Sequence, residues 1–297
     1  MDLPFAVPYE LFPFEHRFVE VGGVPIHYID EGTGDTLLLL HGNPSWSFLY
    51  RKMVPALRDS FRCIALDYPG YGMSGVPDGY GFTPAEHSAV LCRFVDQLAL
   101  SDLTIMVQDW GGPIGLGLAG RRPDLVRALI IGNTFAWPLN GNWRIETFSW
   151  VMGGPVGMRL TRAFNFVPRF FLRRGLAHHV GPDVISLYLA PWPDPARRKA
   201  AVIAPRQLIR ATAYLREVEA GLPTLADRPA LIVWGIGRFR LPGAATPALR
   251  ASVPQPQNHQ VSGRFALPPR RRGRTNSRRD QGIPPGPAGN LTLFWAG

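Results

Sequence analysis

The sequence predicts an α/β fold built around a mostly parallel central sheet. Short apolar, β-branched runs typical of buried strands recur along the chain, at residues 36–40, 61–66, 104–107, 126–132 and 230–234. Segments with apolar residues at three- and four-residue spacing, typical of helices, separate the later strands, at residues 46–57, 84–98 and 113–122. Because alternation of strand and helix favours parallel pairing, we expect helices on both faces of the sheet.

The same patterns divide the chain into a core and an insertion. Two further strands, at residues 17–21 and 26–30, precede the first helix. Between residues 137 and 221 the strand signals stop, and Phe, Trp, Arg and Pro are frequent, which indicates a helical cap inserted after the sixth strand. We therefore expect the first part of the core at residues 1–136, the cap at 137–221, the seventh strand within 222–235, and a tail at 236–297.

Length and composition agree with one enzyme-sized domain. A chain of 297 residues that is 46% hydrophobic can bury one large core plus a lid. Cys63 and Cys92 are the only cysteines and have no metal-ligand spacing, which is typical of core thiols in a reducing compartment. No secretory signal and no apolar run long enough to span a bilayer are found. These features predict a cytoplasmic protein with no membrane partner, no metal and no other cofactor.

A buried strand turns sharply into a helix at residues 104–113. The apolar run 104–107 is followed by Gln-Asp-Trp-Gly-Gly at 108–112, and Pro113 suits the first turn of a helix. The glycines allow a strained turn that presents Asp109 at the carboxyl edge of the sheet. A carboxylate is already anionic and can displace a leaving group from an sp3 carbon directly. The structural alternative is a surface Asp beside a tight turn.

A second loop is expected to lie opposite this turn. The apolar run 37–40 ends in His-Gly-Asn-Pro-Ser-Trp at 41–46. The backbone N–H of Trp110 can face the Asp109 carboxylate, while the indole N–H of Trp110 and the amide of Asn43 can donate to a departing anion. Asn43 also has a structural alternative, as a turn residue before Pro44.

Together these residues resemble the haloalkane dehalogenases within the α/β-hydrolase superfamily. The likeness covers roughly residues 9–235. It rests on His-Gly-Asn-Pro at 41–44, Asp-Tyr-Pro-Gly-Tyr-Gly-Met-Ser at 67–74, Gln-Asp-Trp-Gly-Gly at 108–112 and Gly-Asn-Thr at 132–134. The second motif is general to the superfamily, whereas the Asp at the turn, the following Trp and the loop Asn are more specific. The resemblance implies the α/β-hydrolase fold with a helical cap.

The resemblance also implies a reaction and the residues that carry it. Asp109 would attack the carbon that bears the halogen and form an alkyl ester, with Asn43 and Trp110 as the pair that binds the halide. A water activated by a His would then hydrolyse the ester. The implied partners are a small halogenated hydrocarbon and water. His41 is expected to support its loop through hydrogen bonds, and His178 with His179 is expected to be a histidine pair rather than a metal site.

A cap over the turn would exclude water and enclose the substrate. The candidates to line this pocket are aromatic residues of the cap and of the segment before it: Phe135, Trp137, Trp143, Trp150, Phe164, Phe166 and Phe170. For each of them, plain packing within a small helical layer is the alternative.

The chain departs from the family pattern after Gly235. The family places an acid after the sixth or the seventh strand and a His in a later loop, but residues 130–137 and 236–240 contain no acid. Residues 236–297 hold ten Arg, no Lys, one acid (Asp280), nine Pro and eight Gly, and so carry +9 of the net +10 of the chain. We expect this tail not to fold and the C-terminal strand and helix of the family to be lost. His259 is the only histidine of the tail and is not expected to be held as a base.

Two explanations of the tail remain open. One is a basic tail, with Arg-Arg-Arg-Gly-Arg at 270–274 binding nucleic acid or an acidic surface. The other is a shifted reading frame near codon 236. Codons compatible with segments 238–240, 249–257 and 261–280, read one base later, can encode an Asp, then a Pro-Asn-His ending, then a stretch with a loop His and an acidic amphipathic helix. This order matches the acid, the histidine and the last helix that the family has and this chain lacks. It favours the shifted frame over the basic tail, so a nucleic acid partner is not expected.

If the chain is made as written, the first half of the reaction is expected to survive and the hydrolysis to be impaired. Two other functions remain open. An epoxide hydrolase would use the same Asp turn with cap tyrosines, for which Tyr188 and Tyr214 are available. A non-enzymatic product with a basic binding tail is the second alternative.

Overall fold

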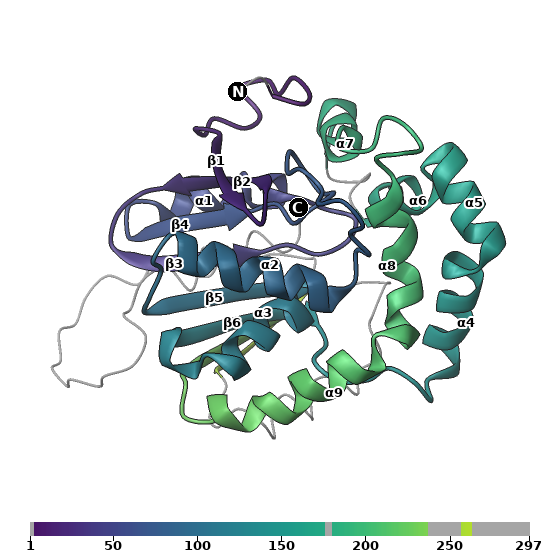
Figure 1. The fold of residues 1–297 in the computed structure, drawn as a ribbon. Coiled ribbons are helices and arrows are strands. Elements are labelled where there is room, and N and C mark those ends of the chain that lie inside the picture. Colours follow the sequence, from purple (N-terminus) through teal and green to yellow (C-terminus); the bar gives the residue numbers. More distant parts are fainter. Residues whose placement is uncertain (1–2, 176–179, 237–256, 263–297) are drawn as a thin grey trace, which may run out of the picture.

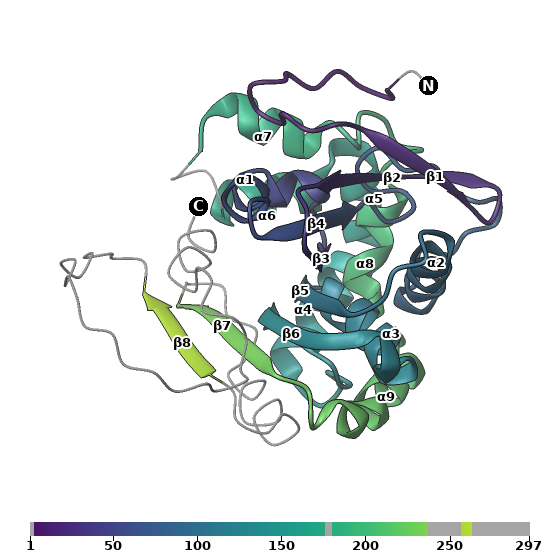
Figure 2. The same cartoon turned by 90° about the vertical axis from the view of Figure 1, so that its left-hand side faces the viewer.

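The computed structural model describes residues 3–175, 180–236 and 257–262. Its eight-stranded sheet has the order β1-β2-β4-β3-β5-β6-β7-β8 (Figures 1 and 2). The strands are β1 (Arg17–Val21), β2 (Val24–Glu31), β3 (Asp35–Leu40), β4 (Phe61–Leu66), β5 (Leu103–Asp109), β6 (Val126–Thr134), β7 (Ala230–Ile236) and β8 (Gln257–Ser262). The pairs β1–β2 and β2–β4 are antiparallel and the others are parallel. The sequence therefore located all seven expected strands.

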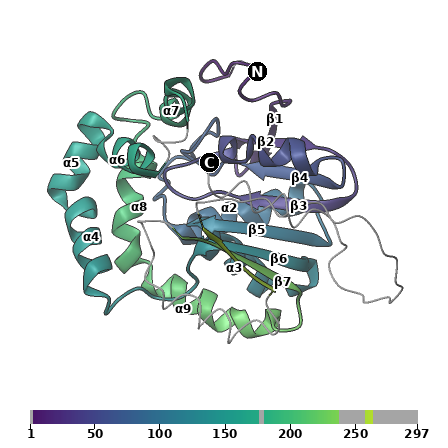
Figure 3. The same cartoon turned by 180° about the vertical axis from the view of Figure 1, so that it is seen from behind.

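Helices cover both faces of the sheet, as expected for an α/β-hydrolase fold. One face packs against α2 (Pro84–Gln97), α3 (Gly111–Arg121) and α9 (Thr212–Gly221), and the other against η1 (Ser47–Tyr50) and α1 (Met53–Leu57) (Figures 1 and 3). Alternate residues of β3 serve the two faces, because Leu38 and Leu40 join the first core cluster while Leu37 and Leu39 join the second. Strands buried on both faces explain why the strand signal was a continuous apolar run.

The helix expected at residues 46–57 is divided into η1 and α1. Pro55 lies inside α1, and a proline ring in a helix clashes with the carbonyl four residues earlier. That carbonyl belongs to Arg51, the first of the two residues between η1 and α1, so a continuous helix is blocked where the structure has the break.

The cap lies between β6 and α9. Its helices are α4 (Trp143–Gly153), α5 (Pro155–Phe164), α6 (Phe166–Gly175), α7 (Pro182–Leu189) and α8 (Lys199–Arg210). They form a layer beside the sheet, with α4 and α5 outermost and α8 nearest the core (Figure 1). Helix α9 instead packs along α3, where the Tyr214 hydroxyl donates to the Pro113 carbonyl at 2.8 Å. We therefore propose that the cap ends before Thr212 rather than at residue 221.

Strand β8 lies within the segment expected to be an unfolded tail. It pairs in parallel with β7, from Leu231 opposite Gln257 to Ile236 opposite Ser262 (Figure 2). The structure thus has a strand at Gln257–Ser262, inside the segment for which the sequence predicted no fold, and the loss of the family's C-terminal strand stays a prediction. This segment contains no Pro, Gly, Asp, Glu, Lys or Arg, so its backbone can form hydrogen bonds along the open edge of β7. The expected loss of the last helix concerns residues 237–256 and 263–297, which lie outside the described residues.

Within the described part of the chain, no helix has both the length and the apolar character needed to cross a bilayer. The same residues contain no group of three or more His, Cys, Asp or Glu side chains arranged to hold a metal ion.

Candidate active site

Asp109 ends β5 and stands on a strained turn into α3. Its φ of 50° lies in the left-handed region, which non-glycine residues adopt rarely. A Cβ at Gly111 would collide with the Leu40 carbonyl, and one at Gly112 would collide with the Thr134 hydroxyl. The Thr134 hydroxyl also donates to the Asp109 carbonyl at 2.6 Å. The two glycines therefore allow the close approach of β3, β6 and α3 that holds this turn.

The Asp109 carboxylate lies at a partly buried position, where two backbone N–H groups donate to it. Its Oδ1 accepts the backbone N–H of Asn43 at 2.7 Å, and the backbone N–H of Trp110 donates to the same carboxylate. Gly42 permits this approach, because a Cβ there would overlap the Asp109 side chain. Burial raises the pKa of Asp109 to about 6, although the two N–H groups oppose the shift. A desolvated carboxylate held by oriented N–H groups is a preorganised nucleophile.

Asn43 and Trp110 flank this carboxylate on different loops. The Asn43 Oδ1 accepts the Tyr71 hydroxyl at 3.2 Å. The Trp110 side chain is buried, and its ring packs edge-on against Phe135 with centroids 5.0 Å apart. Ser45 N–H donates to the Gly42 carbonyl at 3.0 Å, so Asn43 also lies in a tight turn. The two interpretations of Asn43 from the sequence are therefore compatible.

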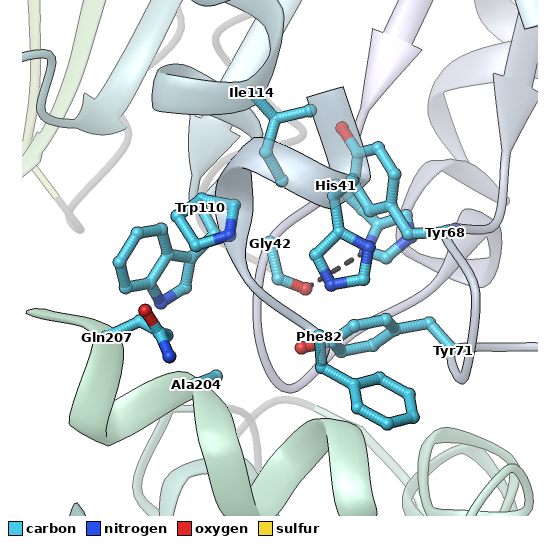
Figure 4. A pocket seen from close by; sticks show the side chains of 11 residues that line it. His41, Gly42, Tyr68, Tyr71, Phe82, Trp110, Ile114, Ala204 and Gln207 are labelled. Atoms are coloured by element: carbon cyan, nitrogen blue, oxygen red, sulfur yellow. Dashed lines mark hydrogen bonds between the residues drawn. The ribbon is translucent and has the colours of Figure 1, made fainter. Parts of the chain in front are cut away.

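A pocket lies between the core and α8 of the cap (Figure 4). Two of its lining residues are next to Asp109, because Gly42 packs closely against the Asp109 side chain and the Trp110 backbone N–H donates to its carboxylate. Figure 4 shows the indole of Trp110 facing Gln207 of α8, and the ring of Tyr71 reaching in from the opposite side. Eleven residues line the pocket: His41, Gly42, Tyr68, Tyr71, Phe82, Pro84, His87, Trp110, Ile114, Ala204 and Gln207. The lining is mostly apolar and aromatic, as expected for a small apolar ligand.

The expected pocket aromatics are not among these lining residues. Phe135 is buried but supports the Trp110 ring from behind, and Trp137 is partly buried against the core cluster. Phe170 packs within the cap on Phe166 and Phe171. Trp150 is 69% exposed on the outer cap helix α4 and is not among the residues that line this pocket.

The other cap aromatics, Trp143, Phe164 and Phe166, are likewise exposed. Helices α4 and α5 form the outer wall of the cap, and the cap residues that line the pocket, Ala204 and Gln207, come from α8. An aromatic-rich sequence does not reveal which helix of a layer faces inward.

His41 is a loop-supporting residue, as expected. Its Nδ1 donates to the Gly42 carbonyl at 3.0 Å, and its Nε2 accepts the Tyr68 backbone N–H at 3.3 Å. Burial lowers the pKa of His41. With both ring nitrogens engaged and the ring neutral, His41 fixes the loop that carries Asn43.

Asp67 ties the two loops of the site together. Its carboxylate accepts the backbone N–H of Ser47 at 2.6 Å and of Met73 at 3.0 Å, and it pairs with His27 at 2.7 Å. Burial raises the pKa of Asp67, but His27 and these hydrogen bonds prevail and hold it below its usual value. The residue fixes the 41–47 loop against the 67–74 loop.

The hydrolytic half of the site is not completed by the side chains that the structure describes. His87 lines the pocket, but its Nδ1 is bonded to the Tyr80 hydroxyl at 2.9 Å, and burial lowers its pKa to about 3. Such a weak base is poorly suited to activate water near neutral pH. The backbone of His259 lies in β8, and its side chain, like those of His178 and His179, lies outside the described residues.

Sequence reasoning missed Tyr71, Phe82, His87 and Gln207 as pocket residues. Tyr71 belongs to the 67–74 motif, which was set aside as general to the superfamily. Its position one residue after Gly70, in a loop expected at the carboxyl edge of the sheet, was an available signal. Gln207 follows Pro205 within a helical segment and gave no such signal.

Comparisons with known proteins give consistent results. A family profile described as the α/β hydrolase fold matches residues 35–179. "Haloalkane dehalogenase 2" of Mycobacterium tuberculosis is 40% identical over 257 residues, covering 86% of this chain and 89% of that protein. "Cis-3-alkyl-4-alkyloxetan-2-one decarboxylase" of Shewanella oneidensis is 33% identical over 262 residues, covering 85% of this chain and 82% of that protein.

Solved structures show the same likeness. The haloalkane dehalogenase DatA from Agrobacterium tumefaciens C58 superposes with a TM-score of 0.75 at 27% identity, covering 84% of this chain and 88% of that chain.

Proposed function

Because this chain belongs to the haloalkane dehalogenases, hydrolases of the α/β-hydrolase superfamily, we propose that Asp109 attacks the halogen-bearing carbon of its substrate. The observation that carries this proposal is the partly buried Asp109 carboxylate on its strained turn, held by the backbone N–H groups of Asn43 and Trp110. A carboxylate so placed needs no base to attack, because it is ionised above its pKa of about 6.

The first step forms an ester and releases halide. An Asp109 oxygen forms a bond to carbon while the carbon–halogen bond breaks, and both bonding electrons leave with the halide. The Asn43 amide and the Trp110 indole are the side-chain donors that would stabilise this anion. The apolar lining of the pocket excludes water, which strengthens these interactions.

The second step requires a base that activates water against the ester. Residues 236–240, which begin at the last residue of β7, contain no acid to orient such a base. We therefore propose that the chain as written releases its first halide but hydrolyses the ester slowly.

Single-turnover measurements test both steps. With excess 1-bromobutane, we expect at most one equivalent of bromide per chain, because each alkylated Asp109 remains blocked. Mass spectrometry of the product should show one butyl group on the peptide that contains Asp109. The readouts are bromide per chain and the position of the adduct.

Asp109→Asn is the control, because it keeps the shape of the side chain and removes the nucleophile. It should release no bromide and carry no adduct. Bromide release that survives this change would contradict Asp109 as nucleophile. Sustained turnover of the unchanged chain would contradict the proposed impairment alone.

A second candidate function comes from the oxetanone decarboxylase relatives. The 33% identity over most of both chains favours testing a cis-3,4-dialkyl-oxetan-2-one beside the bromoalkane. Attack by Asp109 on the sp3 ring carbon C4 would break its bond to the ring oxygen and leave an Asp109 ester and a free carboxylate. Loss of this carboxylate as CO2 would form the alkene and expel the Asp109 carboxylate. Alkene and CO2 formation without bromide release from bromoalkanes would favour this second function.

The two tyrosines expected for an epoxide hydrolase, Tyr188 and Tyr214, are not among the residues that line the pocket. The Tyr188 hydroxyl accepts a hydrogen bond from Arg51 at 2.9 Å, and the Tyr214 hydroxyl donates to the Pro113 carbonyl. Both are engaged outside the pocket lining, so neither is placed to protonate an epoxide.

A further inference from the structure

We propose that Tyr71 is a positioning residue that turns the Asn43 amide so that its N–H groups face the leaving halide. This inference rests on the function proposed above and adds to it a group that sets the affinity of the site for halide.

The geometry assigns distinct partners to the polar groups of Asn43. Its backbone N–H donates to Asp109 Oδ1 at 2.7 Å, and its Oδ1 accepts the Tyr71 hydroxyl at 3.2 Å. With Oδ1 held in this way, the Nδ2 hydrogens are the part of the side chain that can donate to an anion. Tyr71 lines the same pocket as Trp110, the other proposed halide donor.

This hydrogen bond matters because an amide has two ends of nearly equal shape. A 180° turn of the Asn43 amide would present an oxygen with partial negative charge to the halide, which is repulsive. Burial and the nearby Asp109 carboxylate raise the pKa of Tyr71, so its hydroxyl keeps its proton and remains a donor near neutral pH. A permanent donor opposite Oδ1 favours the amide orientation that binds an anion.

Tyr71 is itself held by both the core and the cap. Its ring packs edge-on against Trp192, 5.9 Å away between centroids, and against His41 at 5.4 Å. The Trp192 indole N–H donates to the carbonyl of the preceding Gly70 at 3.2 Å. The hydroxyl is therefore positioned before any ligand enters, and little ordering is required when halide binds.

The test is bromide binding to the Tyr71→Phe chain. This change keeps the packed ring and removes only the hydroxyl. Bromide is titrated without substrate and followed by tryptophan fluorescence. We expect the dissociation constant to rise about fivefold, the size of one neutral hydrogen bond. In single-turnover reactions the rate constant for bromide release should fall while the half-saturating bromoalkane concentration stays unchanged, because the halide charge develops only in the transition state.

Tyr50→Phe is the matched control. Tyr50 is also buried, its hydroxyl has no partner in the described structure, and it is not among the pocket residues. Its loss should leave bromide affinity unchanged, which separates the proposed role from a general effect of losing a buried hydroxyl. Unchanged or tighter bromide binding by Tyr71→Phe would overturn the proposal, the latter by showing that the amide oxygen faces the halide in the native chain.

A double-mutant cycle assigns the effect to Asn43. Asn43→Ala should weaken bromide binding, and adding Tyr71→Phe should cause no further loss, because the hydroxyl acts only through the amide. Additive losses would overturn the proposal. Bromide binding with these dependences but no bromide release from bromoalkanes would contradict the proposed function and leave this inference standing.

Discussion

At the scale of single residues, the chemistry of the site depends on the desolvation of Asp109. Burial favours the neutral acid, and the two backbone N–H groups recover only part of the lost hydration. The raised pKa increases the nucleophilicity expected of the carboxylate above pH 6 but reduces the ionised fraction below it. The balance predicts a pH profile for the first step.

We expect the rate of first bromide release to rise with pH and to level off above about 6, the pKa of Asp109. Below that value only the carboxylate fraction reacts, so the rate should fall about tenfold for each pH unit. Stopped-flow detection of bromide between pH 4.5 and 8 measures this profile. A midpoint near 4, the ordinary value for Asp, would show that Asp109 is hydrated and would contradict the buried geometry.

The same raised pKa has a consequence for stability. The native state holds the proton of Asp109 more tightly than the unfolded chain does. Its contribution is therefore fully present below about pH 4 and is lost as pH rises through about 6. The proposed attack by Asp109 near neutral pH thus requires a desolvated charge that weakens the fold, as is common where reactivity and stability compete.

Residue identities were predictable where the chemistry is local. The turn around Asp109 could be recognised because a strand, two glycines and Pro113 follow one another in sequence. Trp150 could not be placed, because its exposure depends on how α4 packs against α8. Tyr71 could not be paired with Asn43, because the two lie 28 residues apart and meet only through the order of β3 and β4 in the sheet.

At the scale of elements, α2 shows how a local signal supports the pocket. Thr83 and Glu86 form a reciprocal capping box, and Pro84 and His87 of the same first turn line the pocket. This capping box satisfies backbone N–H groups that a helix leaves unpaired at its start. Helix starts with such boxes can be recognised from sequence, whereas the break between η1 and α1 is hidden, because the apolar spacing of residues 46–57 continues through Pro55.

Thr83→Ala should therefore destabilise the chain by about 1 kcal/mol, the usual cost of losing a side-chain cap. Thr147→Ala on the exposed face of α4 is the matched control and should cost nothing measurable. Urea unfolding at pH 7 gives both values. Equal midpoints for the two variants would show that the box at α2 contributes no stability.

At the scale of the whole molecule, the parallel strands direct their carboxyl ends toward the cap. Asp109 ends β5, Asn43 follows β3, and the α8 residues Ala204 and Gln207 close the pocket above them. Ligands of open α/β sheets bind at this edge. The family resemblance implies that a base and its acid would reach the same edge from the loops after β7 and after the next strand. The sheet therefore provides the location for the missing groups even though residues 236–240 provide no carboxylate.

This geometry leads to a prediction about the gene. We propose that a single-base shift near codon 236 separates this chain from a complete enzyme. A chain with residues 1–235 followed by the translation in the neighbouring frame would place an Asp directly after β7 and a His beyond the next strand. It should release many equivalents of bromide, where the chain as written releases one.

The restored chain with Asp109→Asn should again release no bromide, which shows that turnover still passes through the ester. A restored chain limited to one equivalent would contradict the hypothesis. It would show that the neighbouring frame encodes no working base, and that the Arg-rich sequence after β7 has to be explained as a feature of the protein itself. Sequencing the gene through codon 236 provides an independent check, since a shift error would be visible there directly.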